Sequence, residues 1–346
     1  MNARRLEKIE GPGAWTAADL EHDRGWVHHL TGAEIDELDS ALAAVTEAGL
    51  ADRPFPREAF PLPSLGPVLR EVMRGVEEVR GLALLRGIPV ERYDRHSLQA
   101  LYWGLGTFLG EAVSQNSRGE VIASVVDRGN DHGDMNVRGY KTRAALGPHV
   151  DSCDMTTLLC LHNALQGGDS LVTSAPALYN VILTEYPEFL DVMYQGFRHD
   201  LRGEGVTGRL DELTTHAFPI FTYFDGVMSC AFNSRIMRSA RAKAGPPLSA
   251  REDRAIDLVI EIAERPELQY RMHLAPGDVQ IINNYSLLHA RDGYDDTPAS
   301  GAPPRELLRM WFRFHRPRRM LPGYGDRYNT GDRGGVAIGE GARYAF

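Results

Sequence analysis

The sequence predicts an α+β fold in which a barrel or sandwich of short strands is covered by helices. In residues 1–110, apolar residues recur at helical spacing around one short apolar run. From residue 120, short apolar segments are flanked by Gly and Pro turns, which is typical of a β-barrel or sandwich. A helical insert at about 174–265 separates two such β-rich stretches. We therefore expect 1–346 to form one domain with its β core within 120–320.

The first part of the chain contains clear signals for helix ends. Thr31 and Glu34 have the spacing of a capping box, in which each residue caps the other, and the helical pattern then continues to Ala48. Gly49 can end that helix. The other elements expected here are helices over 65–79 and 95–109 and a buried strand over 82–85.

The second part alternates strands with the helical insert. Ser174 is expected to cap a helix over 176–185, and Ser249 with Glu252 is a second capping box that begins a helix to about residue 264. Strands are expected over 121–126, 156–161, 270–274, 279–282 and 307–314.

Composition and charge exclude several classes of function. The chain of 346 residues is 43% hydrophobic and 25% charged, as in ordinary globular proteins. Its net charge of −9 disfavours general nucleic-acid binding, which needs a basic face. No apolar run approaches the roughly 18 residues of a membrane span, and the charged start lacks the apolar region of a signal peptide. The three cysteines, Cys153, Cys160 and Cys230, suit a reducing compartment. We expect a cytoplasmic protein, for which homo-oligomerisation is left open.

A candidate metal site begins at His149 and Asp151. Residues two apart on a strand point to the same side, so an imidazole and a carboxylate could face one ion. A second histidine would complete a 2-His-1-carboxylate facial triad, which leaves positions open for O2 and a chelating co-substrate. With 12 histidines, roughly one His-x-Asp is expected by chance. The rival pair, His132 and Asp134, lies in a Gly/Asp-rich stretch, whereas His149 leads into an apolar strand.

The third ligand is expected far along the chain. His289 follows a turn at 275–278 and the strand over 279–282, at the end of an apolar segment. His273 and His315 are alternatives, but each lies within a strand of mixed polarity. A hydrogen-bonded core histidine is the competing interpretation of His289.

Four blocks in order resemble the taurine dioxygenase and clavaminate synthase-like family of Fe(II)/2-oxoglutarate oxygenases. Together they span roughly residues 80–320. They are GLALLRGIP (81–89) with WGLG (103–106) and LG (109–110), then PHVD (148–151), then GGDSL (167–171) with Tyr179, and finally PGD (276–278), NN (283–284) and HAR (289–291) followed by RELLRMW (305–311).

The resemblance implies a fold and a set of cofactors. The fold is a double-stranded β-helix, a cupin-like jelly-roll barrel with flanking helices, and the cofactors are Fe(II), 2-oxoglutarate and O2. By the same resemblance His149, Asp151 and His289 hold iron, while Ser170 and Arg305 hold 2-oxoglutarate. The chain would then be a single catalytic oxygenase domain that releases succinate and CO2.

The arginine strand leaves one assignment open. Residues 305, 307, 309 and 311 share one face of a strand, so Arg305 and Arg309 both point into the cavity. The stretch from His289 to Arg305 is longer than in compact relatives, and Arg309 is therefore the alternative for the distal carboxylate of 2-oxoglutarate. The family more often has Thr where this chain has Ser170, but a hydroxyl is kept. Asp151 argues against halogenation, because halogenating relatives lack this carboxylate.

The expected substrate is a small anionic molecule, such as an amino acid or a natural-product intermediate. Arg138 and Arg309 could clamp a carboxylate, and Gln115 and Tyr140 could bind an amine or a hydroxyl. Arg138 could equally be a structural loop arginine. The expected reaction oxidises an unactivated C–H bond by hydroxylation, desaturation or cyclisation. The Gly/Thr-rich stretch 198–216 is interpreted either as a lid or as a surface loop.

Two other functions compete with this one. The first is a cupin-like hydrolase or isomerase that uses the same metal ligands without 2-oxoglutarate. Arg305 and Ser170 argue against it, because such an enzyme has no dicarboxylate to bind. The second is a non-catalytic barrel that only binds a ligand.

Overall fold

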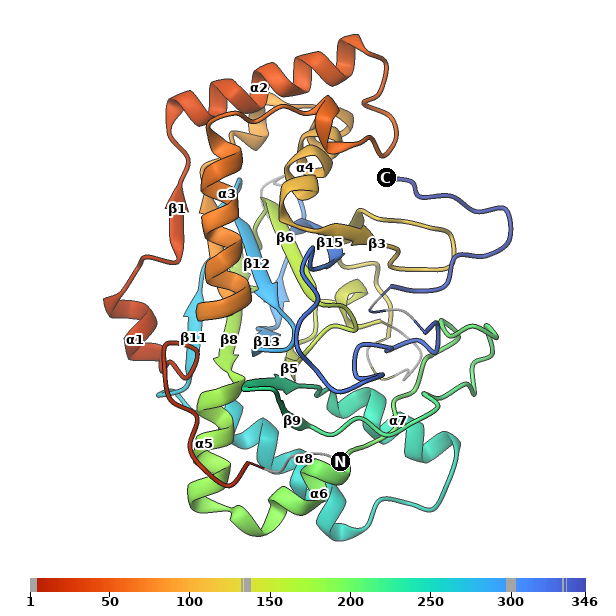
Figure 1. Ribbon diagram of the computed structural model, residues 1–346. Helices are drawn as coiled ribbons and strands as arrows, with labels where there is room; N and C mark the ends of the chain where they lie inside the picture. Colours follow the sequence, from red (N-terminus) through yellow and green to blue (C-terminus); the bar gives the residue numbers. More distant parts are fainter. Residues whose placement is uncertain (1–4, 132, 134–137, 297–302, 332, 334) are drawn as a thin grey trace.

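The computed structural model describes residues 5–131, 133, 138–296, 303–331, 333 and 335–346. Its centre is a pair of β-sheets (Figure 1). The large sheet has the strand order β1 (Val27–His29), β2 (Leu82–Arg86), β12 (Val279–Asn283), β6 (Met155–His162), β15 (Glu306–Arg313) and β3 (Glu111–Val113), and β4 (Ala123–Val125) also pairs with β15. The small sheet has the order β11 (Gln269–Met272), β8 (Ser170–Ser174), β13 (Leu287–Arg291) and β5 (Leu146–His149).

The two sheets share an apolar core. Leu84, Ile282 and Leu307 from the large sheet are buried in the same cluster as Val172 and Leu287 from the small sheet. Apart from the parallel β1–β2 pair, the ladders within both sheets are antiparallel. This arrangement is the predicted jelly-roll barrel, in which a cavity can form between the sheets.

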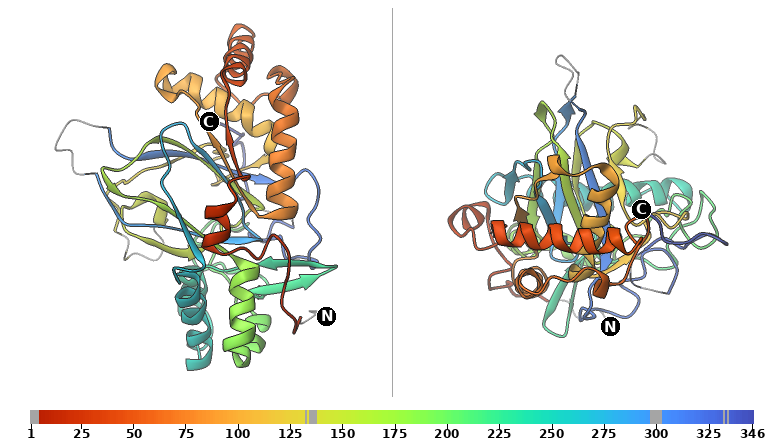
Figure 2. Two further views of the ribbon diagram at one scale, coloured as in Figure 1. Left: turned by 90° about the vertical axis from the view of Figure 1, so that its left-hand side faces the viewer. Right: turned by 90° about the horizontal axis from the view of Figure 1, so that it is seen from above.

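Helices cover the large sheet at one end of the molecule. They are α2 (Gly32–Glu47), α3 (Leu65–Arg74) and α4 (Arg95–Leu109), seen at the top of Figure 1 and in both views of Figure 2. Their apolar faces share one buried cluster with β2, β12, β6 and β15. The predicted capping box of Thr31 and Glu34 is confirmed, and Gly49 follows with φ +65°. The helix expected over 65–79 has two parts. Its first part is α3, and its last turn, Gly75–Val79, is π-helical.

The predicted helical insert lies at the opposite end. It contains α5 (Ala175–Glu185), α6 (Leu190–Gln195), α7 (Ser234–Lys243) and α8 (Ala250–Ala263), grouped at the bottom of Figure 1. Ser174 caps α5, and Ser249 with Glu252 forms the predicted capping box of α8. The insert also contains a β-hairpin, β9 (Phe221–Phe224) with β10 (Val227–Cys230), which we did not predict. These elements share a second buried cluster that reaches Val150 and Leu288 of the small-sheet region.

The remaining elements are short. They are α1 (Ala17–His22), β7 (Gln166–Gly167) paired with β14 (Tyr294–Asp295), and 3-10 turns at Arg57–Ala59, Val90–Arg92, Gly139–Lys141 and Pro187–Phe189. Among the residues described, no helix is both long enough and apolar enough to cross a membrane.

Candidate active site

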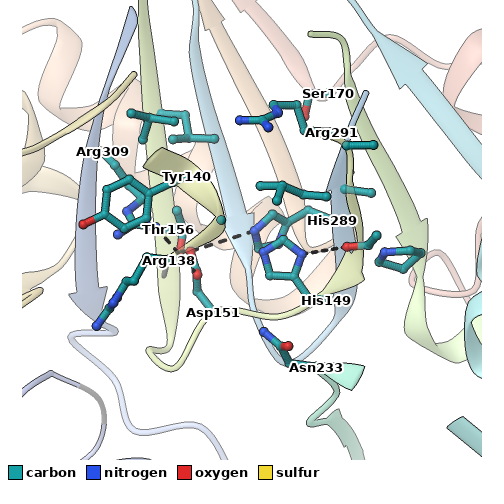
Figure 3. Close-up of a pocket in the computed structure, with 18 of the residues that line it drawn as sticks. Arg138, Tyr140, His149, Asp151, Thr156, Ser170, Asn233, His289, Arg291 and Arg309 are labelled. Carbon is teal, nitrogen blue, oxygen red and sulfur yellow. Dashed lines mark hydrogen bonds and ion pairs between the residues drawn. The ribbon is translucent and has the colours of Figure 1, made fainter. Parts of the chain in front are cut away.

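Two neighbouring strands of the small sheet bring the predicted metal ligands together. His149 ends β5 and lies directly opposite His289 of β13, with the two ring centroids 4.2 Å apart. Asp151 follows β5, and its Oδ2 atom lies 3.8 Å from His289 Nε2. The possible ligand atoms of the three residues all lie within 4.8 Å of one another (Figure 3). Within the described part of the chain, this is the one such group of three His, Cys, Asp or Glu side chains.

Other candidate ligands are not part of this group. His132 and Asp134, the rival pair, lie outside the residues that the structure describes. His273 is exposed and contacts Asp169, with 3.0 Å between Nδ1 and Oδ1. His315 lines a separate surface pocket beside α4.

Hydrogen bonds fix how His149 and Asp151 point. The Nδ1 atom of His149 lies 2.9 Å from the carbonyl oxygen of Gly147, which leaves Nε2 directed at the group. Asp151 Oδ2 accepts hydrogen bonds from Thr156 Oγ1 at 2.8 Å and from Trp311 Nε1 at 3.1 Å. Asn284 holds the same region, because its Oδ1 accepts from the Asp151 backbone N–H and its Nδ2 donates to Thr156 Oγ1. Such outer contacts orient metal ligands and tune their affinity.

The electrostatics favour the protonation states that bind a metal. Burial, together with the neighbouring His149, lowers the pKa of His289 to about 3. Burial also lowers the pKa of His149. For Asp151, burial raises the pKa, but Arg309 and the two histidines outweigh it and the pKa is lowered. At neutral pH the group therefore presents two neutral imidazoles and one carboxylate.

A cavity of about 260 Å³ opens beside this group, between the two sheets. Among the described residues, its wall is strongly basic, with six arginines and one acidic side chain, Asp151. The arginines are Arg138, Arg202, Arg235, Arg291, Arg305 and Arg309. A wall with this charge suits anionic ligands.

One side of the cavity contains Ser170 and two arginines. Arg291 is paired in register with Ser170 across β13 and β8, and the two lie together in Figure 3. Arg305 is 3% exposed and donates through Nη2 to the carbonyl oxygen of Gly168 at 3.2 Å. Its Nε and Nη1 atoms, and Nη1 of Arg291, are buried without hydrogen-bond partners. Three guanidinium nitrogens therefore lack acceptors beside a hydroxyl group.

The Gly167–Gly168 pair explains why this side has room for Arg305. Both glycines have positive φ, +73° and +75°. A Cβ atom on Gly168 would lie 2.8 Å from Arg305 Nε, and one on Gly167 would lie 2.2 Å from the carbonyl oxygen of Gly293. Only glycine tolerates both the left-handed backbone and this close approach.

The other side of the cavity contains Arg309, Tyr140 and Arg138 (Figure 3). The Arg309 guanidinium lies over the Tyr140 ring at 4.4 Å and over the Trp311 ring at 4.8 Å. Its Nη1 atom is 3.9 Å from Asp151 Oδ1, and Nη2 is buried without a partner. Arg138 forms an ion pair with Glu204 and lies 5.6 Å from the Trp311 ring.

Gln115 has a different position from the one we predicted. It is 2% exposed and does not line the cavity. Its Oε1 accepts from Arg309 Nε at 2.7 Å, and its Nε2 donates to the carbonyl oxygens of Val121 and Arg309. The amide is fully used from behind Arg309, so Gln115 positions that arginine instead of touching a ligand.

Sequence reasoning missed several of the lining residues, among them three arginines and one asparagine. Arg291 belongs to the HAR block, and its place two residues after His289 on the same strand predicts that the two side chains share a face. Asn233 and Arg235 lie at the start of α7, and Asn233 forms an isolated bridge with His149. Arg202 lies in the stretch interpreted as a lid or a surface loop. For these last three residues the sequence holds no periodicity that places them at the metal group.

Comparisons with known proteins agree with this geometry. Residues 46–311 match the family described as "Taurine catabolism dioxygenase TauD, TfdA family". The FR-33289 synthase of Streptomyces rubellomurinus is 34% identical over 315 residues, which cover 90% of this chain and 92% of the relative.

Two solved structures share the fold. An asparagine oxygenase bound to Fe(II), 3-hydroxyasparagine and succinate has a TM-score of 0.62 at 16% identity, over 83% of this chain and 93% of the other. The non-haem iron oxygenase OrfP, with Fe and α-ketoglutaric acid, has a TM-score of 0.60 at 14% identity, over 90% and 100% of the two chains.

These findings confirm the predicted jelly-roll, the enzyme class and the cofactors Fe(II) and 2-oxoglutarate. Neither a cupin-like hydrolase or isomerase nor a non-catalytic barrel is supported by the family match. The chain belongs to the TauD/TfdA family of Fe(II)- and 2-oxoglutarate-dependent dioxygenases.

Proposed function

We propose that His149, Asp151 and His289 hold Fe(II) in this chain. The observation that carries this proposal is the convergence of two imidazoles and one carboxylate, with ligand atoms within 4.8 Å, at the wall of a cavity. This donor set fits a facial-triad iron, which needs open positions on its remaining side. The lowered pKa values of both histidines support the fit, because a protonated imidazole cannot bind a metal.

The distal carboxylate of 2-oxoglutarate is assigned to Arg305, with Ser170 and Arg291 beside it. The support is the set of unpartnered guanidinium nitrogens on Arg305 and Arg291 next to a hydroxyl. A guanidinium and a carboxylate match each other through two parallel hydrogen bonds. Arg309 is less suited, because Gln115 already takes its Nε and Asp151 lies near its Nη1.

Iron, 2-oxoglutarate and O2 together supply the oxidation of an unactivated C–H bond, with succinate and CO2 as co-products. The chain's own residues bind and orient. Thr156 and Trp311 keep Asp151 in place, and Gln115 keeps Arg309 between two aromatic rings. The side chains around the cavity decide which C–H bond is presented.

We assign substrate binding to Arg138, Tyr140 and Arg309. The proposed substrate is a small anionic molecule, either amino-acid-like or a natural-product intermediate. The basic wall supports an anion. The asparagine oxygenase supports an amino-acid-like molecule, and the FR-33289 synthase supports a natural-product intermediate. The same site is compatible with hydroxylation, desaturation or cyclisation of the substrate. Asp151 argues against halogenation.

The remaining proposals concern the protein's setting. We propose that the chain works as one domain in the reducing cytoplasm, supported by three buried, unpaired cysteines, Cys153, Cys160 and Cys230. The proposed binding partner is a small-molecule substrate. Homo-oligomerisation stays a prediction that light scattering can check.

An anaerobic titration tests the central proposal. Fe(II) is added to the full-length chain with 2-oxoglutarate, and the metal-to-ligand charge-transfer band in the visible region is followed. We expect the band to need both additions and to saturate at one iron per chain. No band in the unmodified protein would contradict the assignment. A screen of small carboxylic acids for succinate release would then identify substrates.

A further inference from the structure

The substrate side of the cavity holds more positive charge than Arg138 and Arg309 provide. Arg202 and Arg235 also line it, from the loop between α6 and β9 and from the start of α7. In Figure 3, Arg138, Tyr140 and Arg309 lie on the far side of Asp151 from Ser170 and Arg291. Arg202 is electrostatically close to Arg138 and Arg235, and also to His149. Arg138, Arg202, Arg235 and Arg309 therefore form a second arginine cluster, separate from the side proposed to bind 2-oxoglutarate.

Arg202 is held in an unusual conformation. Its φ is +52°, in the left-handed region that residues other than glycine seldom adopt. The backbone is fixed by its own N–H, which donates to Asp200 Oδ1 at 2.9 Å, and by Leu201 N, which donates to the carbonyl oxygen of Glu212. Backbone strain of this kind persists where the surrounding structure over-determines it and gathers at ligand sites.

Among the residues that the structure describes, Glu204 and Asp200 already have cationic partners. Glu204 pairs with Arg138, and Asp200 Oδ2 lies 2.8 Å from Lys243 Nζ. The Arg202 Nε atom is buried and has no hydrogen-bond partner. Burial, followed by the like charge of Arg138, lowers the pKa of Arg202 to about 10. Asp200 opposes this shift, but its carboxylate also pairs with Lys243. A buried guanidinium close to other arginines is therefore stabilised when a further anion joins it.

We propose that Arg202 and Arg235 form a subsite for an oxyanion group of the substrate, at the end of the cavity away from Ser170. This inference rests on the proposed function, which it deepens by naming a substrate with a terminal carboxylate or phosphoryl-type group. A guanidinium fork matches both kinds of oxyanion. Binding of its oxyanion group by these two arginines holds the substrate near the iron ligands. That position determines which C–H bond is presented for oxidation.

Calorimetric titration with inorganic phosphate and with acetate tests the subsite. The full-length chain is used anaerobically, first with Fe(II) and saturating 2-oxoglutarate, and then without either. We expect Arg202→Gln and Arg235→Gln each to weaken binding of the preferred anion about tenfold in both settings. Arg202→Lys, which keeps the charge and the same backbone requirement, should recover part of the affinity. Tighter binding of phosphate or of acetate then identifies the group.

Two controls make the result decisive. Arg209→Gln removes an exposed arginine of the same loop that pairs with Asp211, and it should leave anion binding unchanged. Arg305→Gln should lose 2-oxoglutarate but keep the anion. The inference is overturned if neither anion binds, if Arg202→Gln and Arg235→Gln bind as the unmodified chain does, or if only Arg305→Gln loses binding. A missing charge-transfer band in the unmodified chain would instead contradict the proposed function, while the measurement without iron still tests the subsite.

Discussion

The two sides of the cavity are built in different ways. On one side, Ser170 and Arg291 lie on paired strands, and Arg305 immediately precedes β15. On the other side, Arg138 and Arg202 come from loops, and only Arg309 comes from a strand. A rigid sheet suits a co-substrate that is the same in every turnover, whereas loops allow the specificity of a common fold to vary. On the proposed assignment, the strand-built side serves the chemistry shared by the family, and the loop-built side serves the selectivity of this chain.

Removing one of the proposed iron ligands, which lie between the two sides, should have the largest effect on activity. Asp151→Ala deletes the carboxylate that Thr156 and Trp311 orient, and we expect loss of both the charge-transfer band and succinate formation. Iron content and absorbance measure this loss. His273→Ala is the matched control, because His273 is exposed and should leave iron binding intact. Iron binding that survives in Asp151→Ala would mean that the metal is held elsewhere.

The strand-built side can be tested through its arginine. Arg305→Gln should raise the dissociation constant of 2-oxoglutarate about 100-fold, the usual cost of removing one partner from a buried charged pair. Arg309→Gln should change 2-oxoglutarate binding far less, since Arg309 is tied to Gln115. Titration of the charge-transfer band with 2-oxoglutarate gives both constants. The reverse order would assign the co-substrate to Arg309.

A smaller change on the same side tests whether Gly168 leaves the room that Arg305 needs. Gly168→Ala places a methyl group 2.8 Å from Arg305 Nε at a residue with φ +75°. We expect about tenfold weaker 2-oxoglutarate binding, since a left-handed alanine is strained and the arginine must move. Gly49→Ala is matched in backbone, with φ +65°, but nothing lies within 4 Å of its added Cβ. It should cost stability without affecting 2-oxoglutarate, and equal losses in the two variants would exclude steric displacement of Arg305.

The smallest expected effect concerns the loop-built side. Arg138→Ala removes the ion pair that joins its loop to Glu204, and a partly buried pair contributes about 1 kcal/mol. Backbone amides over 201–214 should then exchange hydrogen about fivefold faster, which mass spectrometry can follow. Arg209→Ala, which breaks an exposed pair within the same loop, should have little effect. Unchanged exchange in Arg138→Ala would mean that this side is held as firmly as the strands.

Local signals in the sequence predicted most of the fold. The capping boxes at Thr31 and Ser249 mark helix starts because the first-turn N–H groups need nearby acceptors. β5 was harder to recognise, because Leu146–His149 contains Gly147 and Pro148. These residues are tolerated there because β5 is the edge strand of the small sheet, where proline removes no ladder hydrogen bond.

The sequence by itself determined the chemical class of this enzyme. His149, Ser170 and His289 lie on strands, and Asp151 and Arg305 lie within two residues of a strand end. The order of these residues along the chain matches a known family. Short motifs suffice where the regular geometry of a sheet converts spacing into direction.

Only the tertiary structure decided what surrounds that centre. It placed Gln115 behind Arg309, and it brought Arg202 from a loop and Arg235 from the start of α7 to the cavity wall. Loop backbones have no repeating geometry, so the direction of their side chains depends on packing and ion pairs such as Arg138 with Glu204. For that reason the residues that we propose to hold iron and 2-oxoglutarate could be named from the sequence, whereas Arg202 and Arg235 could not.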